Sequence, residues 1–334
     1  MSLRNPTRWL TIIGVGLVVF FLLSIFIGRY PRPYWMPPVL LTQDDLAWRL
    51  VFNLRVPRLL TALLLGATLS ACGTVLQMIF RNPLVEPGFL GVTQGAAFGA
   101  AASILWLARS PLVIEVMATA FGLGGLFLSY YLANKLRFGG WVLRLVLAGI
   151  AVSALFSAGV GILKFIADPL TQLPDITFWL LGGLYSVTWR DFLYLLPLVV
   201  FGLLVAYLMR WRLNLLALDD ETAFSFGILP SRERVFLLVA IVSATAAITS
   251  VSGVVGWVGL IVPHISRRVF GASGQFSLPG AMMIGGIFAM LCDDVARTLM
   301  AGEIPLGIVT SFIGAFLFLY MMIRLGSRED YGKG

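Results

Sequence analysis

The chain has 334 residues, of which 59% are hydrophobic and only 12% are charged, and its mean hydropathy is +0.93. A soluble globular domain carries about 25% charged residues, so this composition excludes one. The formal net charge of +8 would suggest a nucleic-acid partner in a soluble protein. In a membrane protein the same excess belongs to the cytoplasmic loops, where Lys and Arg accumulate, and we expect no nucleic acid to bind.

Apolar runs of roughly 20 residues, the length of helix that crosses a bilayer, recur from end to end. They predict an all-α polytopic membrane protein with a single transmembrane domain over residues 1–334. The first run is longer than the apolar part of a signal peptide and no small-residue cleavage site follows it, so we interpret it as a span. The predicted spans, of which the eighth is short for a full crossing, are 9–28, 56–79, 90–108, 112–134, 145–166, 191–209, 233–251, 256–269, 277–299 and 306–324.

The distribution of basic residues predicts the orientation of these ten spans. With both termini in the cytoplasm, most of the 24 Lys and Arg residues fall on the inner side, as the positive-inside rule requires. The exceptions on the outer side are Arg29, Arg32, Arg49, Arg55, Arg58, Arg109, Lys164, Arg190 and Arg297.

The second span carries small and hydroxylic residues along one side, which is typical of a helix buried among others or lining a path. Gln77 is its one strongly polar side chain. We interpret it either as a partner in an interhelical hydrogen bond or as a contact of a translocation path.

The stretch RNPLVEP (81–87) ends the second helix, because a residue before proline disfavours the helical conformation. Gly91, Gly95 and Gly99 then recur every four residues, so the third helix presents a ridge without side chains against which another helix can pack closely. Residues 168–189 are too rich in Pro and Gly for a spanning helix and predict a short helix lying partly in the membrane at one face.

The segment 210–234 is the longest predicted cytoplasmic loop. Its acidic stretch can cap the second of two short helices, since negative charge suits a helix start, and Gly227 can end that helix. The apolar face and acidic tip favour docking on a cytosolic partner over a merely solvated loop. The residues expected on the apolar side are Leu213, Leu216, Ala217, Ala223 and Phe226.

Three arginines stand near the outer face. Arg55 and Arg58 begin the second predicted helix, and Arg297 lies near the end of the ninth, where Asp293 at i,i+4 predicts a local salt bridge. We interpret the arginines either as anchors at the lipid headgroups or as a basic rim that recognises carboxylates of an extracytoplasmic protein through bidentate bonds.

The sequence offers no candidate residues for a disulfide framework, a metal site or a phosphate-binding loop. Cys72 and Cys292 lie inside apolar runs and are interpreted as small buried hydrophobes. His264 has no second ligand at metal-binding spacing. No phosphate-binding loop of the GxxxxGK[ST] form is present, so the chain cannot energise transport with ATP by itself.

Five segments together resemble the permease subunits of type II ABC importers of the FecCD type, in family order and over nearly the whole chain. This family carries iron–siderophore complexes, haem, vitamin B12 and, in some members, molybdate or tungstate. The segments are LRVPRLLTALLLGATLSACGTVLQMIFRNPLVEPGFLGVTQGA, FWLLGG, LLALDDETAFSFGI, GWVGLIVPHISRR and EIPLGIVTSFIGAFLFLYMM.

The resemblance implies a multi-pass subunit of the cell membrane that works with a second copy of itself. Two ATP-binding cassette subunits would lie below it and an extracytoplasmic substrate-binding protein above it. ATP and Mg would bind to the ATPase, so no cofactor, metal or catalytic residue is expected on this chain. The cargo expected first is an iron(III)–siderophore, with vitamin B12, haem and molybdate or tungstate as alternatives.

The resemblance also implies roles for particular residues. Residues 215–228 look like the coupling helices that fit a groove on the ATPase, and Asp219 departs from the glycine usual there. Arg55, Arg58 and Arg297 match positions that receive acidic residues of the binding protein in the vitamin B12 member. A gate is expected by position at Trp141, Val142 and Leu143, with Gln77 as a path contact. The coupling residues are Leu216, Leu218, Asp219, Asp220, Glu221, Ala223 and Gly227.

Three rival classes explain the sequence less well. An ion-coupled secondary transporter predicts an internal repeat and ionisable groups at the membrane midplane, and neither is evident. A membrane enzyme needs His, Asp or Cys clustered near one face. A purely structural membrane protein gives no reason for the loop 210–234.

Overall fold

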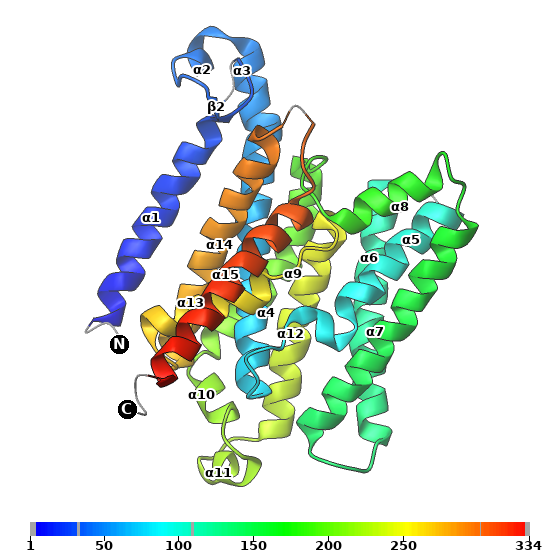
Figure 1. Ribbon diagram of the computed structural model, residues 1–334, viewed down its shortest axis with the longest axis vertical. Helices are drawn as coiled ribbons and strands as arrows, with labels where there is room; N and C mark the ends of the chain where they lie inside the picture. The colour runs from blue at the N-terminus through cyan, green and yellow to red at the C-terminus, as the bar shows by residue number, and fades with distance from the viewer. Residues whose placement is uncertain (1–4, 32–33, 108–109, 301, 331–334) are drawn as a thin grey trace.

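Helices make up most of the chain and form one bundle (Figure 1). The computed structural model describes residues 5–31, 34–107, 110–300 and 302–330. In these residues two short strands, β1 (Ile27–Gly28) and β2 (Tyr34–Trp35), pair antiparallel. The helices are α1 Pro6–Phe26, α2 Leu40–Gln43, α3 Asp45–Arg49, the π-helical turn η1 Leu50–Arg55, α4 Val56–Ile79, the 3-10 turn η2 Pro87–Leu90, α5 Val92–Trp106, α6 Pro111–Lys135, α7 Trp141–Ile166, α8 Gln172–Leu181, α9 Trp189–Leu208, α10 Arg212–Leu216, α11 Asp220–Ser225, α12 Pro230–Ser252, α13 Val258–Phe270, α14 Gly274–Thr298 and α15 Leu306–Asp330.

Each of the ten predicted spans coincides with one helix of the described chain. Eight helices are long and apolar enough to cross a membrane. The other two, α5 with 15 residues and α13 with 13, rise only about 22 and 20 Å, less than the roughly 30 Å of a bilayer core. The third predicted span is thus shorter than expected, and the eighth is short as expected.

The second membrane helix begins earlier than predicted. The chain is helical without a break from Asp45 through η1 and α4 to Ile79, a run of 35 residues. Pro57 would suit the first turn of a helix that begins at 56. Here the wider π-helical turn directly before it accommodates the proline inside a continuous helix. Arg55 and Arg58 therefore lie within this helix rather than at its beginning.

Helix α4 is the central element of the bundle and is buried along most of its length. An added Cβ at Gly66 would lie 1.9 Å from the carbonyl oxygen of Gly285 on α14, so the two backbones touch. The predicted glycine ridge of α5 is confirmed. An added Cβ at Gly95 or Gly99 would lie 2.4 Å from a carbonyl oxygen of α6.

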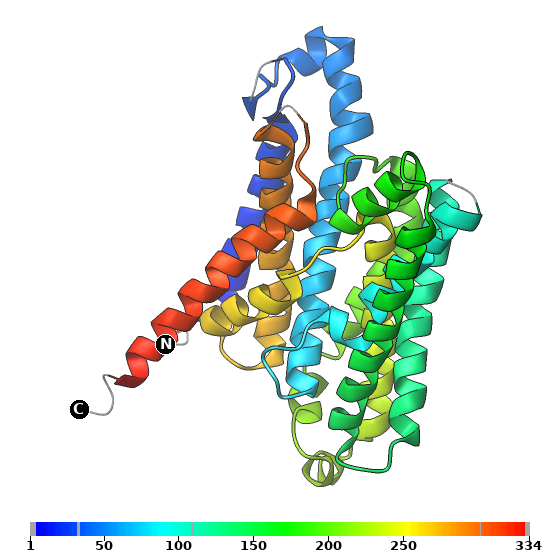
Figure 2. The same ribbon diagram turned by 45° about the vertical axis from the view of Figure 1, so that its right-hand side comes forward.

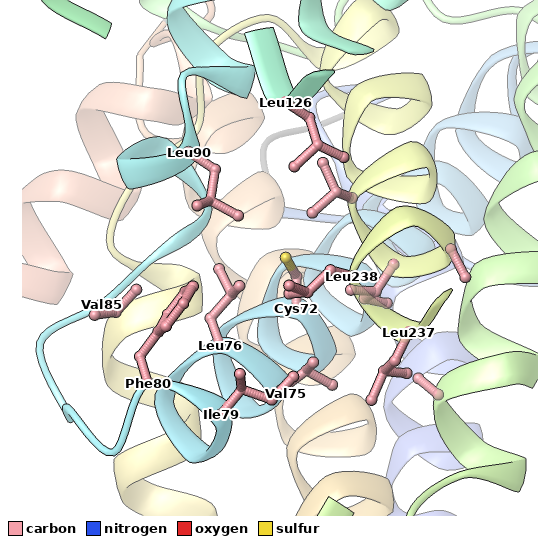
Figure 3. Close-up of a cluster of buried hydrophobic side chains, with 14 of the residues drawn as sticks. Cys72, Val75, Leu76, Ile79, Phe80, Val85, Leu90, Leu126, Leu237 and Leu238 are labelled. Carbon is pink, nitrogen blue, oxygen red and sulfur yellow. The ribbon is translucent and has the colours of Figure 1, made fainter. Parts of the chain in front are cut away.

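A large apolar cluster joins α4 to α12 and to the turn between α4 and α5 (Figure 3). Cys72 is buried there with a free thiol, and Cys292 is buried in a second cluster, as the sequence predicts. Figure 3 labels Cys72, Val75, Leu76, Ile79, Phe80, Val85, Leu90, Leu126, Leu237 and Leu238.

The two ends of the bundle differ. At one end, here called the cap end, β1, β2, α2 and α3 form a cap that rises above the other helices at the top of α4 (Figures 1 and 2). At the opposite end, the loop end, α10 and α11 protrude from the bundle. The short helix predicted within 168–189 is confirmed as α8, which lies toward the cap end.

Candidate functional site

Two short helices form at the loop end, as the sequence predicts. Helix α10 and helix α11 are joined by residues 217–219, and Gly227 follows the end of α11 at a φ of 78°, a conformation that favours glycine. Leu213, Leu216 and Ala223 are fully buried and anchor the loop to the bundle. The prediction for Phe226 is wrong, because its side chain is 63% exposed. It follows the last turn of α11 and so leaves the buried side.

The acidic residues of this loop have different surroundings. Asp219 precedes α11 and accepts a hydrogen bond from the Thr222 hydroxyl at 2.5 Å, which lowers the pKa of the carboxyl below its usual value. Its φ of −66° suits any residue, so an aspartate in place of glycine causes no strain. Asp220 pairs with Arg234 at 2.6 Å, and Glu221 is exposed.

The remaining coupling candidates lie on the same loop. Leu218 is half-buried beside the α10–α11 turn. Phe224, Phe226 and Leu229 expose large apolar side chains around α11. A buried base with an exposed apolar and acidic tip is the arrangement expected of a protein-docking surface.

Arg234 is a functional candidate that sequence reasoning missed. It lies in α12 and is 5% exposed, and its guanidinium reaches both α10 and α11. In the sequence it is one of two arginines in SRER, and no local signal separates it from the exposed Arg232.

Three predicted docking arginines come together at the cap end, but they do not form an exposed rim. Arg55, Arg58 and Arg297 are only 8%, 9% and 7% exposed. Arg58 binds Asp293 with Nε–Oδ1 2.9 Å, and it binds Glu303 with Nη1–Oε2 2.8 Å. The helices α1, α4 and α14 pack closely here and enclose the guanidinium groups.

Arg297 and Arg55 complete this arginine cluster. Arg297 binds Asp294, donates to the main-chain oxygen of Ser24 at 2.8 Å, and lies 3.9 Å from Asp293, which is the predicted i,i+4 pair. Its Nε and Nη1 are buried without a hydrogen-bond partner. Arg55 donates to the carbonyl oxygens of Ile25 at 3.0 Å and Tyr30 at 3.4 Å, and it has no ion pair within the described chain.

Two cavities adjoin this cluster. The first, about 350 Å³, is lined by four arginines and one carboxylate: Arg29, Arg55, Arg58, Arg297 and Glu303. Because arginines exceed acids in its wall, it is suited to an anionic group.

The second cavity, about 660 Å³, lies beside the first and has a smaller share of charged residues in its wall. Residues of α6, α8, α12 and the start of α15 line it, including Glu115, Trp179 and Ser250. Arg58 and Glu303 belong to the walls of both cavities, so their ion pair stands between them.

The turn between α4 and α5 contacts α13. Gln77, 4% exposed, donates to the carbonyl oxygens of Gly259 and Leu260 and accepts from Arg267 at 2.6 Å, so the interhelical hydrogen bond predicted as one alternative is present. Burial raises the pKa of Glu86, whose carboxylate accepts from the backbone of Trp257.

The predicted gate residues lie together at the start of α7. Trp141 begins α7 and stacks on Phe80 with ring centroids 6.5 Å apart. Val142 is half-buried against the apolar cluster that contains Phe80, while Leu143 is exposed. Among the residues that the structure describes, no group of His, Cys, Asp and Glu is suited to hold a metal ion.

This architecture is that of a multi-pass integral membrane protein. Eight described helices are able to cross a bilayer, and the loop that holds α10 and α11 lies at the opposite end from an arginine-lined cavity. The chain matches the FecCD transport family over residues 16–324 and belongs to that family. It is accordingly a permease subunit of an ABC importer for metal chelates and related substrates, a transport component rather than an enzyme.

Known relatives match most of the chain. It is 38% identical over 323 residues to the molybdate import system permease protein MolB of Haemophilus influenzae, covering 94% of this chain and 95% of that one. It is 39% identical over 277 residues to a probable iron chelatin transport system permease protein of Helicobacter pylori, covering 82% of each. A solved inward-facing putative metal-chelate type ABC transporter superposes with a TM-score of 0.88 at 37% identity, covering 95% of this chain and 99% of that chain.

Proposed function

We propose that the chain carries an iron(III)–siderophore complex across the membrane, along an axis between itself and a second copy. The observation that carries this proposal is the match to a metal-chelate type transporter over 95% of the chain, together with a relative named for iron chelatin transport. A chelated metal needs few specific contacts within the protein, and selectivity rests mainly with the binding protein.

The loop end faces the cytoplasm and receives two ATP-binding cassette subunits, which hold ATP and Mg. The exposed apolar side chains of α11 and the acids Asp220 and Glu221 support this role for the loop. The first residues of α1 and the last residues of α15 lie in the half of the bundle nearer the loop end (Figure 1). This position supports cytoplasmic termini.

The cap end receives the substrate-binding protein. An acidic side chain of that protein enters the arginine-lined cavity, where the guanidinium groups of Arg29 and Arg55 supply donors. With Arg29, which also lines the cavity, four arginines face the three carboxylates of Asp293, Asp294 and Glu303, so one incoming carboxylate balances the charge.

Transport follows from differential binding. ATP favours one packing of the two permease copies and ADP another, and the coupling helices transmit that preference to the bundle. We assign the gate to Trp141, Val142 and Leu143, and we assign Gln77 to the translocation path. Gln77 acts through α13, which it contacts.

Co-purification with the ATP-binding subunit of the importer tests the assignment. We expect a stable complex that Asp220→Lys together with Glu221→Lys dissolves, since the changes reverse the charge at the loop tip. Failure of the unaltered chain to bind any ATPase would contradict the proposal.

A second cargo is favoured by one observation, the 38% identity to a molybdate permease over 94% of the chain. Uptake of radioactive iron–siderophore and of molybdate into proteoliposomes, with the matching binding proteins, separates the two. Iron uptake that excess molybdate leaves unchanged supports the iron chelate, and molybdate uptake alone overturns it.

A further inference from the structure

One buried guanidinium joins three parts of the loop end. Arg234 of α12 donates from Nε and Nη2 to the carbonyl oxygen of Leu216 at 3.1 and 2.8 Å. Its Nη2 also donates to the carbonyl oxygen of Leu218 at 3.1 Å, and its Nη1 binds Asp220 at 2.6 Å. The same side chain thus contacts the end of α10, the α10–α11 turn and the first residue of α11.

These contacts suit an arginine and no other side chain. The last carbonyls of a helix have no partner within the helix, and a cation is favourable beside them. The rigid planar fork of arginine fixes the direction of each acceptor, whereas a lysine ammonium is a single point charge. Leu216 and Ala223 attach the two short helices to the bundle by burial, and Arg234 sets their orientation relative to α12.

Helix α12 connects this contact to the other end of the molecule. Its 23 residues extend about 35 Å, and most of its side chains from Leu237 to Ser252 are buried. Near its far end, Ser250 and Val251 line the 660 Å³ cavity. The two sites therefore lie at opposite ends of one stiff element.

The neighbouring ion pairs do not share these properties. Arg212 binds Glu233 at 2.7 Å, and Arg81 lies 3.8 Å from Asp219, but both arginine side chains are more than half exposed. Exposed pairs contribute little to structure because water screens them. Arg234 is the buried member of this group.

We propose that Arg234 is the positioning residue that links the coupling helices α10 and α11 to α12. Through this link, a displacement of α10 and α11 by the ATPase reaches the 660 Å³ cavity at the cap end. The inference rests on the proposed function of the loop as the ATPase-docking surface. It assigns the transmission step to a residue outside the docking surface itself.

Transport measured per ATP hydrolysed tests this link in the assembled complex in proteoliposomes. In Arg234→Gln we expect the ATPase to stay bound, while the cargo transported per ATP falls by about tenfold, as expected on loss of hydrogen bonds from a charged group. The control Arg212→Gln removes an exposed arginine from the same loop and is expected to leave the ratio unchanged. An unaltered ratio in Arg234→Gln overturns the proposal.

Hydrogen exchange of the permease alone gives a readout independent of the ATPase. Arg234→Lys keeps the buried charge but loses the fork, and we expect faster exchange in residues 212–225 while α4 and α14 stay unchanged. If Arg234→Gln does not fold, Arg234→Lys decides, since unchanged exchange and an unchanged transport ratio would refute the link. If the unaltered chain recruits no ATPase, the docking function fails, while exchange still tests the contact.

Discussion

Asp293 is the fully buried carboxylate that holds Arg58 in the arginine cluster. Asp293→Asn is expected to lower the free energy of unfolding by about 3 kcal/mol, because Arg58 then keeps only the partly exposed Glu303 and the buried cluster gains an unbalanced positive charge. Thermal unfolding in detergent measures the change. Asp45→Asn breaks the exposed Asp45–Arg49 pair in the cap and should leave the unfolding temperature unchanged. Equal effects of the two changes would contradict the buried ion pair.

Arg55 offers the cleaner test of docking, because it binds main-chain oxygens and has no ion pair in the described chain. Its change to Gln leaves the Arg58 and Arg297 pairs intact. We expect the affinity for the binding protein to fall about tenfold at low ionic strength and less at high salt, which screens the lost attraction.

The matched control for that measurement is Arg49→Gln, an exposed arginine one to two turns earlier on the same continuous helix. It should bind the partner normally. Loss of binding in Arg49→Gln but not in Arg55→Gln would place the docking surface on the cap instead.

At the scale of the helix, α4 and α14 pack through close contact of their backbones. Gly66→Ala places a methyl group 1.9 Å from the Gly285 carbonyl oxygen, and neither backbone has room to move. We expect a markedly lower unfolding temperature and a reduced yield. Gly161→Ala on α7 adds the same methyl group where no atom lies within 4 Å and should be neutral, and a comparable loss there would show a general effect of helix glycines.

The helices were largely predictable from sequence, and their long-range contacts were not. Apolar run length located all ten main helices, since a bilayer sets a minimum length. The π-helical turn at Leu50–Arg55 leaves no such signature, so the start of the second helix was placed eleven residues too late. The partners of Arg58 lie 235 and 245 residues away in the chain, beyond any local pattern.

For the candidate site, sequence patterns predicted the loop 210–234 but not the contacts of Arg234 that hold its two short helices together. Acidic residues and glycine marked α11 and its end, because these residue types suit helix termini. Burial of Arg55, Arg58 and Arg297 was missed, since an arginine near a helix end usually extends toward the membrane surface. Arg234 was missed because its acceptors are main-chain oxygens, which no sequence displays.

For the whole molecule, the orientation in the membrane follows from single-cysteine labelling. Cys72 and Cys292 are buried and give little background. With a membrane-impermeant thiol reagent, we expect Phe224→Cys to react only from the cytoplasmic side and Tyr34→Cys only from the outside, since both positions are exposed at opposite ends. The reverse pattern would invert the proposed sides.

The continuous helix from Asp45 to Ile79 has a consequence for the cap. Its 35 residues extend about 52 Å, roughly 20 Å more than a bilayer core. A rigid rod of fixed length makes the height of the cap above the lipid depend on bilayer thickness, because any hydrophobic mismatch is taken up by tilt or by local change in the lipid. Lipid chain length thus adjusts how far the cap extends above the membrane surface.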